Sequence, residues 1–106
     1  MQSVSEITVA ELKANQSAYK ILDVRRPDEW AGELGHIAGA TLVTLETDFE
    51  GFLQKLPKDQ TYAMVCRSGM RSARAAELAK AQGFSNVVNV KGGMIAWNAE
   101  GFDVER

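Results

Sequence analysis

Short apolar runs alternate with helical patterns along nearly the whole chain, and this alternation restricts the possible folds more than any other feature. Runs typical of strands lie at residues 20–24, 40–45, 61–65 and 86–90. Strands that alternate with helices favour an α/β fold, in which a small parallel sheet has helices on both faces. The run at 61–65 (TYAMV) is the most continuously apolar, so we expect a central strand there, buried on both sides.

Helical patterns fill the segments between and after these runs. The strongest lies at residues 71–82, which are rich in alanine, and Gly83 is well placed to end it. Thr8 and Glu11 have the spacing of a capping box at the start of the first helix. The remaining helices are predicted at residues 7–15, 27–30, 48–56 and 93–100.

The length and charge of the chain limit the number of domains and the kinds of partner that we expect. A length of 106 residues suits one domain, over residues 1–106. The formal net charge of -2 gives no reason to expect nucleic acid or an anionic membrane as a partner. No apolar stretch is long enough to span a bilayer, and the N-terminus lacks the features of a secretory signal. We therefore expect a cytoplasmic protein.

The segment after the central run carries the only cysteine, Cys66. It is followed by Arg67, Ser68, Gly69, Met70, Arg71 and Ser72, where the strongest helical pattern begins. Ligands of parallel sheets bind at the carboxyl ends of the strands, so this loop is the first place to look for chemistry. The opening N–H groups of a helix lack partners within the helix and lie at the positive end of its dipole. A loop that curls round the sulfur would direct several N–H groups at it.

These surroundings favour the thiolate form of Cys66. Arg67 and Arg71 would add positive charge, and Gly69 would allow a tight turn. Cysteines in such settings have pKa values of about 3.5–7.5, against about 8.5 for a free cysteine. A lone cysteine is more often a small buried core residue, but two arginines and a glycine are unusual neighbours for one. For Met70, a position at the start of the helix that touches the core or the rim is at least as good an interpretation as a substrate contact.

Four stretches resemble segments of rhodanese domains, in the order in which that family carries them. CRSGMRS resembles the active-site loop, and LDVRRPDEW resembles the Leu-Asp-Val-Arg segment that precedes Pro, an acid and an aromatic residue. GHIAGA and GGMIAW resemble the Gly-His-Ile-Pro-Gly-Ala and Gly-Gly-x-x-Ala-Trp segments. The resemblance extends over about residues 7–102, and it identifies the chain as a single-domain rhodanese of the thiosulfate sulfurtransferase-like kind.

The resemblance implies a sulfurtransferase that carries sulfane sulfur as a persulfide on Cys66 and needs no metal or organic cofactor. Thiosulfate or another persulfide would be the donor, and cyanide, a thiol or a sulfur-carrier protein would be the acceptor. Backbone N–H groups of the loop, from Arg67 to Ser72, would stabilise the persulfide. Transfer through a covalent intermediate would give ping-pong kinetics.

Two other functions fit the same fold. One is a non-catalytic interaction or regulatory module, although such modules often lack the cysteine that this chain keeps. The other is a cysteine phosphatase or arsenate reductase. The phosphatase loop has five residues between cysteine and arginine, whereas four lie between Cys66 and Arg71. A shorter loop makes a tighter ring of N–H groups, which suits a single sulfur better than a phosphate.

Asp23 and Arg25 end the first predicted strand, which should neighbour the cysteine strand. By resemblance Asp23 is a conformational residue of the site, and we interpret both residues as support for the site rather than as catalysts. A local ion pair or turn cap is the plainer alternative for this pair. His36, the only histidine, is interpreted as a loop residue that bonds locally. We interpret Trp30 and Trp97 as residues that pack in the core or at its rim, and Arg74 as a solvated charge.

Two positions depart from thiosulfate-preferring two-domain rhodaneses. Ser68 stands where those enzymes carry a basic residue, and Glu29 stands where they carry arginine. Both changes remove positive charge that would attract a dianionic donor. We therefore expect thiosulfate to be a convenient test substrate rather than the physiological donor.

Overall fold

The computed structural model describes residues 4–106, which fold around a parallel sheet. Its five strands lie in the order β1 (Ser5–Ile7), β5 (Val87–Val90), β4 (Tyr62–Val65), β2 (Lys20–Asp23) and β3 (Thr41–Leu42). Every neighbouring pair is parallel. β4 is central and all its residues are buried, as its continuous apolar character predicts. The α/β fold with a parallel sheet is thus confirmed.

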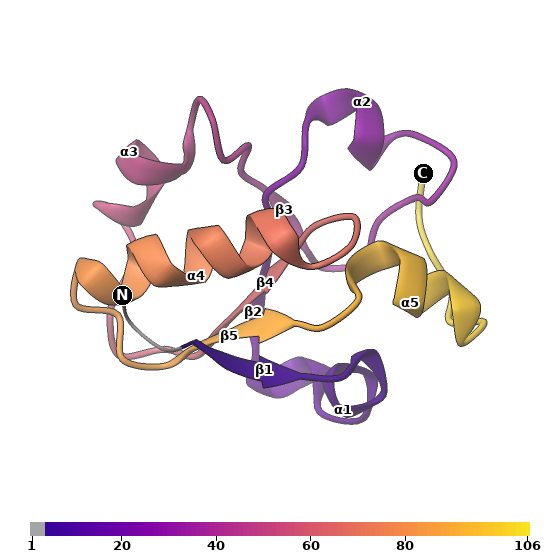
Figure 1. Ribbon diagram of the computed structural model, residues 1–106, viewed down its shortest axis with the longest axis horizontal. Helices are drawn as coiled ribbons and strands as arrows, with labels where there is room; N and C mark the ends of the chain where they lie inside the picture. The colour runs from indigo at the N-terminus through magenta and orange to yellow at the C-terminus, as the bar shows by residue number, and fades with distance from the viewer. Residues whose placement is uncertain (1–3) are drawn as a thin grey trace.

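Helices cover both faces of the sheet (Figure 1). One face packs against α3 (Phe49–Leu53) and α4 (Met70–Ala81), and the other packs against α1 (Val9–Ala14) and α5 (Gly93–Ala99). A single-turn helix, α2 (Pro27–Trp30), follows β2, and a short 3-10 helix covers Gln16–Ala18. No helix in the described part of the chain is long and apolar enough to cross a membrane.

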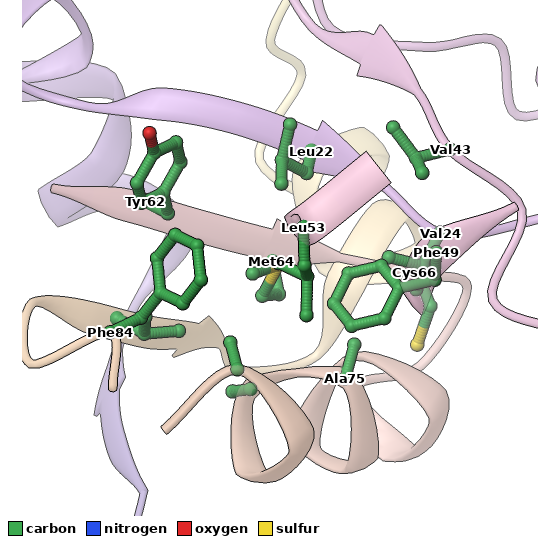
Figure 2. Close-up of a cluster of buried hydrophobic side chains, with 13 residues drawn as sticks. Leu22, Val24, Val43, Phe49, Leu53, Tyr62, Met64, Cys66, Ala75 and Phe84 are labelled. Carbon is green, nitrogen blue, oxygen red and sulfur yellow. The ribbon is translucent and has the colours of Figure 1, made fainter. Parts of the chain in front are cut away.

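The alternation of side chains along the strands divides the core in two. Leu22 and Met64 point into the cluster under α3 and α4, while Ile21 and Ala63 point into the cluster under α1 and α5. Cys66 belongs to the first cluster, directly after β4 (Figure 2). The position that carries the sulfur is therefore anchored by the most buried strand of the sheet.

The N-terminal segment shows one success and one error of the sequence analysis. The capping box is present: the Glu11 N–H donates to the Thr8 hydroxyl at 3.1 Å, and the Thr8 N–H donates to the Glu11 carboxylate at 2.9 Å. The helix was expected from residue 7, but Ile7 ends strand β1 and the helix begins at Val9. β1 was missed because it has three residues, lies at the sheet edge and is mostly exposed, so it shows no apolar run.

Two other elements are shorter than expected by more than one residue. α3 ends at Leu53 rather than at residue 56, and the chain continues as a turn in which the Leu56 N–H donates to the Leu53 carbonyl. Pro57 disfavours helical geometry in the residue before it, which helps to explain the early end. β3 covers only Thr41–Leu42 of the predicted residues 40–45. These differences lie at the ends of elements and leave the topology unchanged.

Candidate active site

Cys66 lies at the carboxyl end of the central strand, where the loop of residues 67–69 leads into α4. Its Sγ accepts hydrogen bonds from the Gly69 N–H at 3.1 Å and from the Ser72 hydroxyl at 3.3 Å. The residue is 1% exposed. Figure 2 shows the sulfur at the edge of the apolar cluster, beside the segment that leads into α4. The loop thus curls round the sulfur instead of leaving it among aliphatic side chains alone.

The surroundings of Cys66 act on its pKa in opposite directions. Burial is the largest single influence, and it raises the pKa because it penalises the charged form. Hydrogen bonds from the Ser72 hydroxyl and from the backbone N–H groups of Ser72, Gly69 and Ser68 lower the pKa. Together they outweigh burial, so the pKa of the thiol lies below its ordinary value. The site favours a thiolate mainly through neutral hydrogen-bond donors.

Glycines allow the N-terminus of α5 to pack against the same loop. The Met94 N–H donates to the Cys66 carbonyl at 2.9 Å, and the Ile95 N–H donates to the Arg67 carbonyl at 3.0 Å. Gly93 has a φ of 54°, and a Cβ there would collide with the Cys66 carbonyl. The GGM segment therefore fixes the loop from the side of α5.

Asn89, in β5, is a site residue that the sequence analysis missed. Its side-chain N–H groups donate to the Gly69 carbonyl and to the Glu6 carboxylate, each at 3.1 Å. Its side-chain oxygen accepts from the Ser72 hydroxyl at 2.5 Å. Asn89 is 1% exposed and contacts two of the loop positions that touch the sulfur. The available signal was a polar residue within an otherwise apolar strand, VVNV.

Asp23 and Arg25 form a buried ion pair, and neither is among the described residues that donate a hydrogen bond to the sulfur. The Arg25 Nε–H and a terminal N–H donate to the two Asp23 oxygens at 2.9 and 2.7 Å. Other Arg25 N–H groups donate to the Glu29 and Gly35 carbonyls at 3.2 and 2.7 Å. The local ion pair that sequence analysis held as the plainer alternative is therefore present. It also holds the segment from α2 to Gly35, which faces the loop.

Arg71 was expected to add positive charge beside Cys66, and the structure gives it an internal partner. Its two terminal nitrogens donate to the two Glu29 oxygens at 2.7 and 2.8 Å. Hydrogen bonding by Arg71 is the largest of the influences on the pKa of Glu29, which falls to about 2. Glu29 likewise raises the pKa of Arg71, and a charge on Cys66 adds to that effect. The Arg71 charge is thus felt at the sulfur while its facing N–H groups are bound to Glu29.

The other loop side chains turn to the surface. Arg67, Ser68 and Met70 are exposed, and Met70 is exposed over 81% of its area. Packing into the core, one of the interpretations of Met70, is therefore wrong. A position on the rim of the site is what the structure shows.

Comparison with known proteins places the chain in a family. The sequence model of the rhodanese-like domain matches residues 8–100. The chain belongs to this family. Over 79 residues it is 44% identical to MoeZ of Mycobacterium tuberculosis, a match that covers 73% of this chain and 19% of MoeZ. It therefore spans about a fifth of that relative's length. YtwF of Bacillus subtilis is 39% identical over 101 residues, which cover 92% of this chain and 93% of that protein.

The relatives and a solved structure agree on fold and on the kind of protein. The names of both MoeZ and YtwF contain the word sulfurtransferase. A crystal structure of a rhodanese-related protein from Thermoplasma volcanium superposes with a TM-score of 0.83 at 35% identity, and covers 93% of this chain and 95% of that one. The rhodanese-like fold expected from the sequence is thus confirmed.

Several side chains of this rhodanese-like domain serve packing. His36 stacks on Trp30 with ring centroids 3.6 Å apart, and its Nδ1 lies 2.9 Å from the Trp30 carbonyl. Trp97 is buried and its ring N–H donates to the Asp103 carbonyl at 2.9 Å. Arg74 is exposed on α4. The structure therefore gives each of these residues the place that was expected for it.

Proposed function

We propose that this rhodanese-like domain is a sulfurtransferase that carries sulfane sulfur as a persulfide on Cys66. The observation that supports it most directly is the pair of hydrogen bonds to Sγ, from Gly69 and Ser72, which lower the pKa of a buried thiol. The thiolate is the nucleophilic form of cysteine. Arg67 to Ser72 form the persulfide-binding loop in this proposal, while Asp23, Arg25 and Asn89 position the elements around it.

The first step loads sulfur onto the enzyme. The Cys66 thiolate attacks the outer sulfur of thiosulfate or of another persulfide, and a bond forms between the two sulfurs. The original bond of the donor breaks, and its electron pair leaves with sulfite or with the donor's thiolate. With thiosulfate, one negative charge stays on the persulfide and two leave with sulfite, so no proton or oxidant is required. The N–H groups that hold the thiolate then face the persulfide.

The second step returns the enzyme to its first state. Cyanide, a thiolate or a sulfur-carrier protein attacks the outer sulfur of the persulfide, and the sulfur–sulfur bond to Cys66 breaks. Its electron pair stays on Sγ, which is again a thiolate held by the Gly69 N–H. Two displacements through one covalent intermediate give ping-pong kinetics. Neither step draws on a metal or an organic cofactor.

The burial of the sulfur favours this chemistry over phosphate transfer. A side chain that is 1% exposed can be approached by a slender terminal sulfur more easily than by a phosphate with three outer oxygens. The four-residue spacing between Cys66 and Arg71 acts in the same direction, because it tightens the loop. The phosphatase alternative predicts turnover of an aryl phosphate that depends on Cys66.

Intact-mass measurement after treatment with thiosulfate tests the proposal. We expect the protein to gain the mass of one sulfur atom, and cyanide to remove it with formation of thiocyanate. Cys66→Ser should gain nothing, whereas Arg74→Ala, which alters an exposed position on α4, should load as the unaltered chain does. If neither thiosulfate nor a persulfide adds sulfur to Cys66, the proposed function is wrong.

A further inference from the structure

Glu29 occupies Arg71, the arginine that a donor anion would otherwise meet beside the cysteine loop. Arg71 presents two N–H groups in parallel, and each is bound to one Glu29 oxygen, at 2.7 and 2.8 Å. This fork geometry is also how arginine binds the oxygens of phosphate and similar anions. The two side chains keep 28% and 15% exposure, so the pair lies at the surface of the site. Glu29 thus takes the position of an external anion.

The Glu29 carboxylate is held in place from its own helix. The Arg26 N–H donates to the carboxylate at 3.2 Å, and Arg25 donates to the Glu29 main-chain carbonyl at 3.2 Å. Glu29 therefore reaches Arg71 from a segment that is fixed on two sides. An anion that bound Arg71 in the fork geometry would have to displace a preformed carboxylate.

The surface next to the loop gives an incoming anion little further attraction. A hollow of about 280 Å³ is lined by Arg67 together with the acidic residues Asp28, Glu29 and Glu33. Arg25 also lines it, but its guanidinium is bound to Asp23. Asp28 is paired with Arg26 and Glu29 with Arg71, so the charges of these side chains largely cancel. A donor with two negative charges therefore finds less attraction here than a free Arg71 would give, and a donor with fewer charges loses less.

We propose that Glu29 determines donor selectivity: by occupying Arg71, it biases Cys66 against dianionic donors and in favour of donors with one negative charge or none, such as alkyl persulfides. This inference rests on the proposed function. With an alkyl persulfide, the Cys66 thiolate attacks the terminal sulfur, and the alkyl thiolate leaves with the electron pair of the broken bond. The proton of the terminal sulfur moves with it, so atoms and charges balance without a further reactant.

The test compares two donors that share a sulfonyl–sulfur bond but differ in charge: thiosulfate, a dianion, and methanethiosulfonate, a monoanion. The second-order rate of loading of Cys66 is measured with each, and alkylation by uncharged iodoacetamide corrects for changes in the thiolate itself. We expect Glu29→Gln to raise the corrected rate with thiosulfate roughly tenfold and that with methanethiosulfonate by less, with the gain shrinking in high salt.

Two further variants distinguish the effect of occupying Arg71 from the effect of removing any negative charge near the loop. Asp28→Asn removes the same charge from the same helix, but the Asp28 carboxylate pairs with Arg26, whereas Arg71 pairs with Glu29. We expect it to change the selectivity much less. Adding Arg71→Gln to Glu29→Gln should abolish most of the gain, because the freed guanidinium is then gone. An equal effect of Asp28→Asn, or a gain that survives without Arg71, would overturn the inference.

The failure of the proposal differs visibly from the failure of the proposed function. If the unaltered protein accepts sulfur from neither donor, the proposed function fails and the selectivity proposal fails with it. If both donors load Cys66 and Glu29→Gln leaves the ratio of their corrected rates unchanged, only the role of Glu29 is wrong. If Glu29→Gln does not fold, Glu29→Ala removes the same carboxylate and takes its place in the comparison.

Discussion

Two arginine–carboxylate pairs of similar geometry lie near the cysteine loop, and they differ in their access to water. In both pairs two arginine nitrogens meet the two oxygens of one carboxylate. The side chains of Asp23 and Arg25 are each 1% exposed, whereas those of Arg71 and Glu29 are 28% and 15% exposed. The first pair joins residues two apart in sequence, and the second joins residues 42 apart.

Because the two arginine–carboxylate pairs differ in exposure, they have different roles, although they contain the same chemical groups. Once Asp23 and Arg25 are buried together, neither charge can lose its partner without a large cost, since water cannot replace it. Arg25 also binds the main-chain carbonyl of Glu29 within α2 and that of Gly35 beyond it, so this pair belongs to the frame of the molecule. Partly exposed pairs contribute much less to stability, because water competes for both ions. The Glu29–Arg71 pair is therefore free to act on the electrostatics of the loop.

Removing one arginine from each pair tests this difference in role most directly. Arg25→Met leaves the Asp23 carboxylate buried without its partner, and we expect a loss of about 3–5 kcal/mol in the free energy of unfolding. Proteins commonly have only about 5–15 kcal/mol in total, so this loss is a large share of the stability. Arg71→Met is the matched control and should lose about 1 kcal/mol or less. Urea denaturation measures both, and equal losses would contradict the comparison.

The next largest predicted effect is the dependence on pH of the stability that Glu29 contributes. Its pKa falls from 4.5 to about 2 in the folded chain, with the hydrogen bond to Arg71 as the largest cause. A carboxylate whose folded pKa is lowered adds stability above its unfolded pKa and loses it as the pH falls through the folded value. We expect Glu29→Gln to be less stable than the unaltered chain by about 1 kcal/mol near neutral pH.

That stability gap has a defined pH window, which makes the prediction strict. It should be constant above the unfolded pKa of 4.5 and should close as the pH approaches about 2. Urea denaturation of both proteins over a series of pH values measures it. Asp28→Asn is the control on the same helix, and the side chain of Asp28 is 72% exposed. A gap that widens in acid, or one that Asp28→Asn reproduces, would show that the Arg71 contact is not its source.

The parts of the fold that were predictable are those that local patterns encode. The buried strand β4, the capping box at Thr8 and the helix that follows Cys66 each depend on residues close together in sequence. β1 was not predictable in this way, because its three residues become a strand only through pairing with β5. The same distinction holds for the site. The loop from Cys66 to Ser72 is one contiguous segment, so its geometry followed from the order of strand, glycine and helix.

The long-range contacts of the site could not be predicted from local sequence patterns. Asn89 reaches Gly69 across 20 positions, and Glu29 reaches Arg71 across 42. Glu29 was recognised only as a lost positive charge, because nothing near it in sequence indicates its partner. Likewise, the sequence analysis expected Arg67 and Arg71 to favour the thiolate by adding positive charge nearby. The structure gives the contacts with Sγ to Gly69 and Ser72 and binds Arg71 to Glu29.

The smallest predicted effect concerns this neutral part of the site. The single proton of the Ser72 hydroxyl is shared between Sγ at 3.3 Å and the Asn89 oxygen at 2.5 Å, so only part of it serves the thiolate. Ser72→Ala should therefore raise the pKa of Cys66 modestly, while the backbone N–H groups of Ser68, Gly69 and residue 72 remain. The midpoint of the pH profile of iodoacetamide alkylation should move to higher pH, with a severalfold slower rate near neutral pH.

The matched control for that effect is Ser68→Ala, because Ser68 acts on the sulfur through its backbone N–H and its side chain is exposed. This variant should leave the alkylation profile in place. If Ser72→Ala also leaves it in place, the backbone N–H groups alone hold the thiolate. If instead Glu29→Gln moves the midpoint further than Ser72→Ala does, the charge of Arg71 outweighs the neutral donors at the sulfur. The exposed ion pair would then set the ionisation of Cys66 as well as its choice of donor.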